Sequence, residues 1–176
     1  MILPIVAFGA PILRENCKDI TSQYPYLNDL VANMWETMYN ANGVGLAAPQ
    51  INKAIKLFIV DTTPFIDEEG DELQLQPVKK VFINARIIEE KGEEWDFNEG
   101  CLSIPEIRED ITRKSSITIK YFDKNFKKHI DIFDGLTARV IQHEYDHVNG
   151  VLFTDKISPL RKRMIKGKLI DISKGK

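Results

Sequence analysis

The segment Gln142-His143-Glu144-Tyr145-Asp146-His147 contains the pattern His-Glu-x-x-His. Residues four apart lie on one face of an α-helix, one turn above each other, so His143 and His147 can direct two imidazoles at one point. Glu144 stands beside the first histidine, within reach of a molecule bound there. Two imidazoles on a divalent metal, with a carboxylate close by, are typical of hydrolytic metal sites. Two solvated histidines at a polar helix end are the alternative, and this motif alone does not choose between them.

A helix is predicted over residues 135–149, around this motif. Leu136 and Val140 precede the histidines at helical spacing. Asp134 is a plausible N-cap, and Gly150 follows the last periodic residue as a left-handed terminator. The apolar flanks indicate that the histidines face inward.

The composition is that of a soluble globular protein. The chain has 176 residues, a net charge of −2, 43% hydrophobic and 28% charged residues, so a single domain over 1–176 is expected. Two cysteines are too few for a disulfide framework. Prolines and an arginine interrupt the apolar residues near Met1, and no stretch reaches the ~18 apolar residues of a membrane span. We expect a cytoplasmic protein with free thiols and no membrane or DNA partner.

Helices and strands are mixed along the chain. An apolar stripe from Leu27 to Met38 predicts a helix that ends near 40–43. Ser158 and Pro159 form an N-cap and first-turn pair that begins a final helix. Strands are expected at 56–61, 80–88, 93–97, 115–123, 127–133 and, as a short piece, 151–153. This pattern predicts an α+β fold, mainly antiparallel strands around a central metal-binding helix, with one helix near each end.

Charge is distributed unevenly. The segment 62–77 is acidic and is expected to be a solvated loop or hairpin tip. From Ser158 onward, seven Lys or Arg and one acidic residue give the basic tail 158–176 a net charge of +6, which leaves −8 for the remainder. A solvated C-terminal helix explains this tail, and docking to a polyanion such as ribosomal RNA is the functional alternative.

A hydrolytic metal site needs three protein ligands and one open position. Cys101, His129 and the carboxylates are the candidates for the third ligand. We favour Cys101, because it stands in the Gly-containing segment Glu99–Ser103 and because thiolate is a strong ligand for Fe²⁺ or Zn²⁺. Taken alone, this cysteine is better explained as a small buried hydrophobe, since free cysteine is commonly buried.

The segment Gly43-Val44-Gly45-Leu46-Ala47-Ala48-Pro49-Gln50 is rich in small residues. Such residues let a backbone approach another group closely, although a tight helix-to-strand turn explains them as well. It is not a dinucleotide-binding loop, because it follows a helix and lacks the third glycine. The amide of Gln50 could donate to a developing oxyanion.

Together, these segments resemble the three motifs of the peptide deformylase family. The motifs stand in the family's order as Gly43–Gln50, Glu99–Ser103 and Gln142–Gly150, with Val148 in place of the family's usual leucine. The resemblance implies metal ligands Cys101, His143 and His147, with Glu144 as general base and acid, and with Gln50 and the Leu102 N–H around the oxyanion. It also implies Fe²⁺ as the ion, with Zn²⁺, Ni²⁺ or Co²⁺ as substitutes. The implied substrates are N-formylmethionyl nascent peptides, which yield formate and a free amino terminus.

Selectivity for a formyl group requires a wall on the outer side of the carbonyl carbon. We expect the two glycine-containing loops, with Gly43, Gly45 and Gly100, to form this wall. The methionine side chain is expected to bind a pocket lined by Val44, Leu136 and Val140.

Two rival functions remain open. A metalloprotease would need a third ligand downstream of His147, where no further histidine is present. A structural metal or RNA-binding module would use the basic tail instead.

Overall fold

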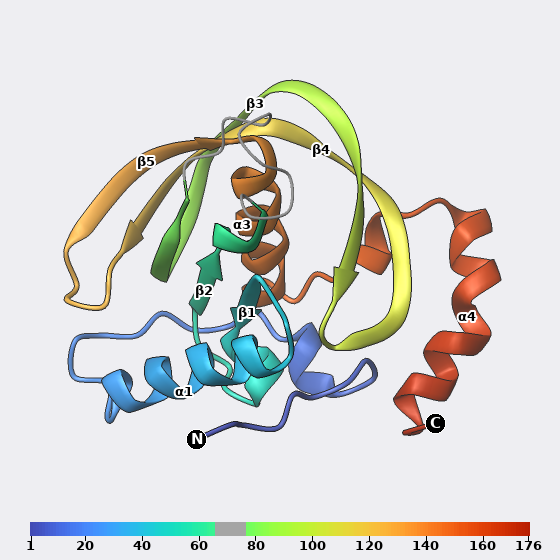
Figure 1. The fold of residues 1–176 in the computed structure, drawn as a ribbon, viewed down its shortest axis with the longest axis horizontal. Helices are drawn as coiled ribbons and strands as arrows, with labels where there is room; N and C mark the ends of the chain where they lie inside the picture. Colours follow the sequence, from blue (N-terminus) through green and yellow to red (C-terminus); the bar gives the residue numbers. More distant parts are fainter. Residues whose placement is uncertain (66–76) are drawn as a thin grey trace.

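The computed structural model describes residues 1–65 and 77–176, and most of the acidic segment predicted over 62–77 lies outside these residues. The described residues form a five-stranded antiparallel sheet with the order β1-β2-β3-β4-β5, together with α-helices and short 3-10 helices (Figure 1). The strands are β1 (Gly45–Ala47), β2 (Leu57–Asp61), β3 (Lys79–Cys101), β4 (Ile104–Phe122) and β5 (Lys128–Asp134). The helices are α1 (Leu27–Asn40), α3 (Gly135–Val148) and α4 (Pro159–Ser173), with 3-10 turns η1 (Pro11–Arg14), η2 (Ala48–Ile51) and η4 (Phe153–Lys156). The α+β prediction is confirmed.

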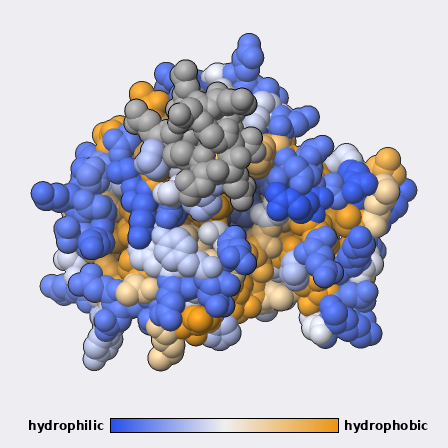
Figure 2. Space-filling view, viewed as in Figure 1, coloured by the Kyte–Doolittle hydropathy of each residue, from blue (hydrophilic) through white to orange (hydrophobic). Residues whose placement is uncertain are grey.

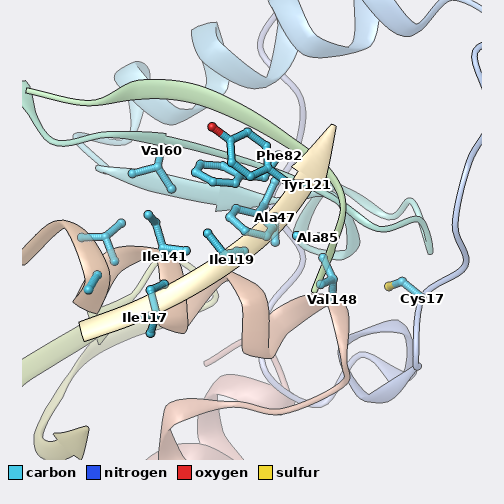
Figure 3. Packing of buried hydrophobic residues seen from close by; sticks show 13 residues of the cluster. Cys17, Ala47, Val60, Phe82, Ala85, Ile117, Ile119, Tyr121, Ile141 and Val148 are labelled. Carbon is cyan, nitrogen blue, oxygen red and sulfur yellow. The ribbon is translucent and has the colours of Figure 1, made fainter. Parts of the chain in front are cut away.

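The central element is α3, over which β3, β4 and β5 arch (Figure 1). Alternate residues of β4 point toward this helix, so Ile117, Ile119 and Tyr121 are buried, whereas the residues between them are half-buried. They share one apolar cluster with Ile141 of α3 and Phe82 of β3 (Figure 3). The amphipathic sheet therefore fixes which face of α3 is turned inward.

Both ends of α3 lie close to their predicted positions. Asp134 occupies the N-cap position, but its side chain makes no capping hydrogen bond. At the other end, Gly150 has φ +76°, the left-handed conformation expected of a terminator. A Cβ there would also lie 2.6 Å from the carbonyl oxygen of Arg14, so the glycine allows the close approach of the N-terminal segment.

The strands predicted at 56–61 and 127–133 match β2 and β5, but the strand predictions between them were wrong in length. Strands expected at 80–88 and 93–97 are one strand, β3, and β4 begins at Ile104 rather than near 115. Residues 88–94 are exposed throughout, so they carry no apolar alternation, and bulges let the paired strands continue around the arch. The strand expected at 151–153 is absent, and Phe153 instead begins η4.

The C-terminal helix α4 begins as predicted. The hydroxyl of Ser158 accepts a hydrogen bond from the Arg161 N–H at 3.2 Å, and Pro159 is the first helical residue. Ile165 is buried in an apolar cluster beside the β3–β4 arch. Apolar residues are visible between this helix and the body of the molecule (Figure 2). Within the described ranges, no helix combines the length and apolarity needed to cross a membrane.

Candidate metal centre

Three side chains of the kinds that bind metals converge between β3 and α3. Cys101 is the last residue of β3, and His143 and His147 lie one turn apart on α3. Their potential ligand atoms all lie within 4.8 Å of one another, and Cys101 Sγ is 3.3 Å from His147 Nε2. The loop expected around Cys101 is therefore the tight connection between two paired strands. His129, the other candidate histidine, lies on β5 with its Nε2 2.8 Å from Asp123 Oδ2, outside this cluster.

His143 is oriented by a buried carboxylate. Its Nδ1 lies 2.9 Å from Oε1 of Glu99, which leaves Nε2 directed away from this partner. Arg113 donates two hydrogen bonds of 2.7 and 3.0 Å to Glu99, and Arg139 donates a third of 2.9 Å. Burial alone would raise the pKa of Glu99, but the hydrogen bonds with His143 and Arg113 outweigh it and lower this pKa to about 2. A charged carboxylate thus fixes the ring of the first histidine.

His147 has a different environment. Its side chain is almost fully buried, and its Nδ1 has no hydrogen-bond partner among the described residues. Burial, followed by the charge of His143, holds the pKa of His147 well below its usual value. This imidazole is therefore neutral, with a ring nitrogen free to donate a lone pair next to the sulfur of Cys101.

The donor set fits a divalent transition metal. One sulfur and two imidazole nitrogens form a three-ligand set of the kind that leaves a coordination position open for catalysis. Burial would lower the pKa of His143, but its hydrogen bonds with Cys101 and Glu99 raise it well above the usual value. The same surroundings that favour a proton on this ring favour a bound cation.

Glu144 stands beside these ligands with its carboxylate turned toward β1. It is buried, and its Oε2 has no hydrogen-bond partner in the described part of the chain. Burial is the main reason that its pKa is raised to about 7. A Cβ on Gly45 would lie 2.7 Å from Oε1 of this carboxylate, so only glycine leaves room for it. The first sequence motif thus lies against the third.

Two amide donors lie near the sulfur of Cys101. The side-chain oxygen of Gln50 accepts from the Ala47 N–H at 2.9 Å, which orients the amide. Its Nε2 lies 3.1 Å from Ser103 Oγ and 3.6 Å from Cys101 Sγ. No acceptor for the backbone N–H of Leu102 is present in the residues that the structure describes. Both groups could therefore donate to a ligand bound at the cluster.

A cavity of about 560 Å³ opens over these residues. Of the predicted site residues, its lining includes Gly43, Val44, Gly45, Gln50, Gly100, Cys101, Leu102, Val140, His143 and Glu144. Leu136 does not line it, contrary to expectation. Leu136 lies seven residues before His143, about 10 Å along the helix axis, whereas Val140 lies within one turn. The helical spacing was correct, but it was extended one turn too far.

Several lining residues were not predicted. Phe97, Ile107 and Arg108 come from the paired ends of β3 and β4, and Phe65 comes from the segment after β2. Burial alternates through Ile107, Glu109, Ile111 and Arg113. Because two of these buried residues are charged, the sequence carries no apolar alternation here, and β4 was expected to start only near residue 115.

The geometry agrees with the comparison to known proteins. The model of the family described as polypeptide deformylase matches residues 2–163. The chain belongs to this family. Peptide deformylases of Christiangramia forsetii and Flavobacterium johnsoniae are 59% and 57% identical to it, each over 100% of this chain and 92% of the relative. Among solved deformylase structures, that from Legionella pneumophila has a TM-score of 0.84 at 35% identity, over 99% of this chain and 96% of the other. The Thermus thermophilus deformylase has a TM-score of 0.86 at 29% identity, over 100% of both chains.

Proposed function

We propose that this protein hydrolyses the formamide bond of N-terminal formylmethionine in newly made polypeptides. Water adds across the bond, so the products are formate and a free amino terminus. The observation that carries this proposal is the convergence of Cys101, His143 and His147 into one cluster, beside a cavity that Cys101, His143 and Glu144 line, in a chain of the deformylase family. A divalent metal held by those three ligands would act as a Lewis acid and lower the pKa of a bound water to ~7.

Glu144 is proposed to move the proton. A carboxylate with a pKa of about 7 can accept a proton from the attacking water and then deliver it to the departing nitrogen. Because its Oε2 has no hydrogen-bond partner among described residues, this oxygen is available for the transfer. Gln50 Nε2 and the Leu102 N–H are proposed to donate to the formyl oxygen as charge develops on it.

The cavity lining supports selectivity for formyl groups. Gly43, Gly45 and Gly100 are proposed to close the space beyond the carbonyl carbon, where a formyl group carries only hydrogen. Val44 and Val140 are proposed to contact the methionine side chain, and we add Phe97 and Ile107 to this pocket because they line the same cavity. An acetylated peptide should therefore be rejected by steric clash.

A matched pair of glycine substitutions tests the position of Glu144. In Gly45→Ala, the new methyl group would lie 2.7 Å from the Glu144 carboxylate and displace it. Gly167→Ala is the control, because a Cβ there meets nothing within 4 Å. We expect formate release from a formyl-Met peptide to fall strongly in the first variant and to stay unchanged in the second.

Glu144→Gln tests the proton transfer directly. Formate release should fall roughly 10²–10⁴-fold, the usual contribution of a positioned acid–base group, while the metal content stays at the wild-type level. Cys101→Ser should instead lose metal. Unimpaired formate release in Glu144→Gln, or faster cleavage of internal peptide bonds than of the formyl group, would overturn the proposal and favour a structural metal site or a metalloprotease.

We propose Fe²⁺ as the working ion, although the same ligands accept Zn²⁺, Ni²⁺ or Co²⁺. The sulfur of Cys101 beside Fe²⁺ should make the enzyme sensitive to oxygen, since a thiolate is readily oxidised. Anaerobic purification should therefore give higher activity and iron content than aerobic purification. Equal activity and equal iron content in both preparations would contradict the proposal that Fe²⁺ is the working ion.

The basic tail supports a second proposal, that a cytoplasmic, single-domain enzyme docks on the ribosome through α4. Its exposed cations include Lys162, Arg163, Lys166 and Lys168. Reversing three of them to Glu should weaken co-sedimentation with ribosomes, and added salt should weaken binding of the unaltered protein. Reversal of the exposed Lys53, Lys91 and Lys124 is the control. Equal ribosome binding by both triple variants would exclude this docking role.

A further inference from the structure

The strand β5 forms one edge of the sheet. Among the described residues it pairs with β4 alone, so the backbone groups along its other side have no strand partner. Its outward face carries four exposed residues, in the order Lys128, Ile130, Ile132 and Asp134. The two isoleucines are 55% and 64% exposed, which is unusual for β-branched apolar side chains next to each other on one face.

The order of these residues is self-complementary. If β5 pairs antiparallel with a second β5 about a two-fold axis at Asp131, Lys128 lies opposite Asp134 of the second copy. In the same register, Ile130 lies opposite Ile132 of the second copy. The symmetry produces each contact twice, so the outward face would contain two oppositely charged pairs and two isoleucine pairs. From this pattern we propose that the β5 edge binds a second copy of this chain, joining two sheets into one.

The charge pattern distinguishes this partner from a general peptide. Exposed strand edges are commonly protected by charged residues, lysine above all, which repel an incoming strand. Here the lysine has an acid at the symmetric position of the same strand, so the two ends attract a copy of themselves. On the neighbouring strand β4, Ile132 and Ile130 lie beside Thr118 and Lys120, so the exposed apolar pair belongs to the edge strand itself.

One contact opposes the dimer. Asp131 would face Asp131 of the second copy on the inner side of the sheet, and like charges directly opposite each other destabilise a strand pair. The Oδ2 of Asp131 accepts a hydrogen bond from the Tyr121 hydroxyl at 2.6 Å, which holds the carboxylate within its own subunit. Asp131→Asn keeps an acceptor for this hydroxyl and removes the repulsion, so it should tighten the dimer severalfold.

Sedimentation velocity from micromolar to near-millimolar concentration tests the proposal. The metal-loaded full chain should form a species of twice 20.2 kDa, with a single concentration-dependent equilibrium. Lys128→Asp should raise the dissociation constant at least tenfold, and so should Asp134→Lys. Combining the two substitutions restores opposite charges at both positions, so the double variant should dimerise again.

Two substitutions of equally exposed apolar residues by lysine control for general surface effects. Ile132→Lys should abolish the dimer, whereas Leu160→Lys on α4, at a residue 63% exposed compared with 64% for Ile132, should leave it intact. None of residues 128–134 lines the metal-site cavity, so formate release reports folding in every variant. A wild-type chain that stays monomeric throughout, or a dimer indifferent to Lys128→Asp and Ile132→Lys, would overturn the proposal.

Discussion

Two arginine–carboxylate pairs in this molecule have nearly the same geometry but different surroundings. Arg113 and Glu99 make two hydrogen bonds of 2.7 and 3.0 Å, and Arg161 and Glu109 make two of 3.0 and 2.6 Å. In the first pair both side chains are buried, at 5% and 4% exposed, whereas in the second the glutamate is 7% exposed but the arginine is 44% exposed. Because the hydrogen-bond distances are similar, we expect burial to determine how much stability each pair contributes.

The buried pair connects the elements that carry the candidate metal ligands. Glu99 belongs to β3, Arg113 to β4, and Arg139 and His143 to α3. Arg113 also donates to Asp146 of α3 at 2.8 Å. The exposed pair connects only α4 to β4, so its loss should leave the candidate metal centre unchanged. This contrast can be tested by substituting one residue of each pair in turn.

Glu99→Ala should have the largest effect. It removes the carboxylate partner of the buried Arg139, leaves Arg113 with Asp146 alone, and frees the His143 ring. Removing one member of a buried ion pair typically costs ~3–5 kcal/mol of unfolding free energy. Urea unfolding of the metal-free protein should show this loss, and the metal content of the purified variant should fall.

Glu99→Gln is the matched control for that variant. It keeps the volume and one hydrogen-bond acceptor, so it should lose less stability than the alanine variant. If Glu99→Ala unfolds at the wild-type urea concentration and retains its metal, burial does not distinguish the two pairs and the comparison fails.

The sequence predicted the helix with the two histidines better than the buried ion pairs that surround it. The span of α3, its end at Gly150 and the convergence of its two histidines followed from helical spacing, which is a local property. Glu99 was recognised only as part of a motif. Its partners Arg113 and Arg139 lie 14 and 40 residues away, and only the pairing of β3 with β4 over α3 brings them together.

The cavity was predicted incompletely for the same reason. Residues contributed by α3 and by the two glycine-containing segments could be named from local motifs, whereas Phe97, Ile107 and Arg108 depend on where β3 and β4 pair. Exposed residues 88–94 gave no alternation that could reveal this long hairpin. Local periodicity therefore could not predict the cavity residues that depend on long-range strand pairing.

Arg161→Ala should have a much smaller effect than Glu99→Ala. The Glu109 side chain is only 7% exposed, but Arg161 is 44% exposed, so water can take the place of its guanidinium, and such a partly exposed pair contributes less to stability than a fully buried one. Thermal unfolding should shift by a small fraction of the shift in Glu99→Ala, and formate release should be unchanged. A loss of metal in Arg161→Ala would show that α4 supports the metal centre, contrary to the contrast between the pairs.

A third pair, Arg14 with Asp155, is more exposed still and should give the smallest effect. The two side chains are 47% and 38% exposed, with hydrogen bonds of 2.6 and 3.1 Å. Burial alone would raise the pKa of Asp155, but the hydrogen bond from Arg14 helps to lower it below 3.8. A lowered carboxyl pKa stabilises the fold above the unfolded value, and this contribution is lost as the pH falls through the folded value.

Asp155→Asn isolates this charge, because an amide oxygen can still accept from the Leu152 N–H that Asp155 Oδ2 now binds at 3.0 Å. The variant should unfold at slightly lower urea concentration than the wild type near pH ~7, and the difference should shrink as the pH falls through the lowered pKa of the wild-type carboxyl, where this group becomes protonated as well. Added salt should shrink the difference near neutral pH, because the pair is open to solvent. A difference that persists unchanged at acidic pH would mean that Asp155 acts through packing or hydrogen bonding rather than through its charge. The Arg14–Asp155 ion pair would then not support the expected decrease in stabilisation from buried to exposed pairs.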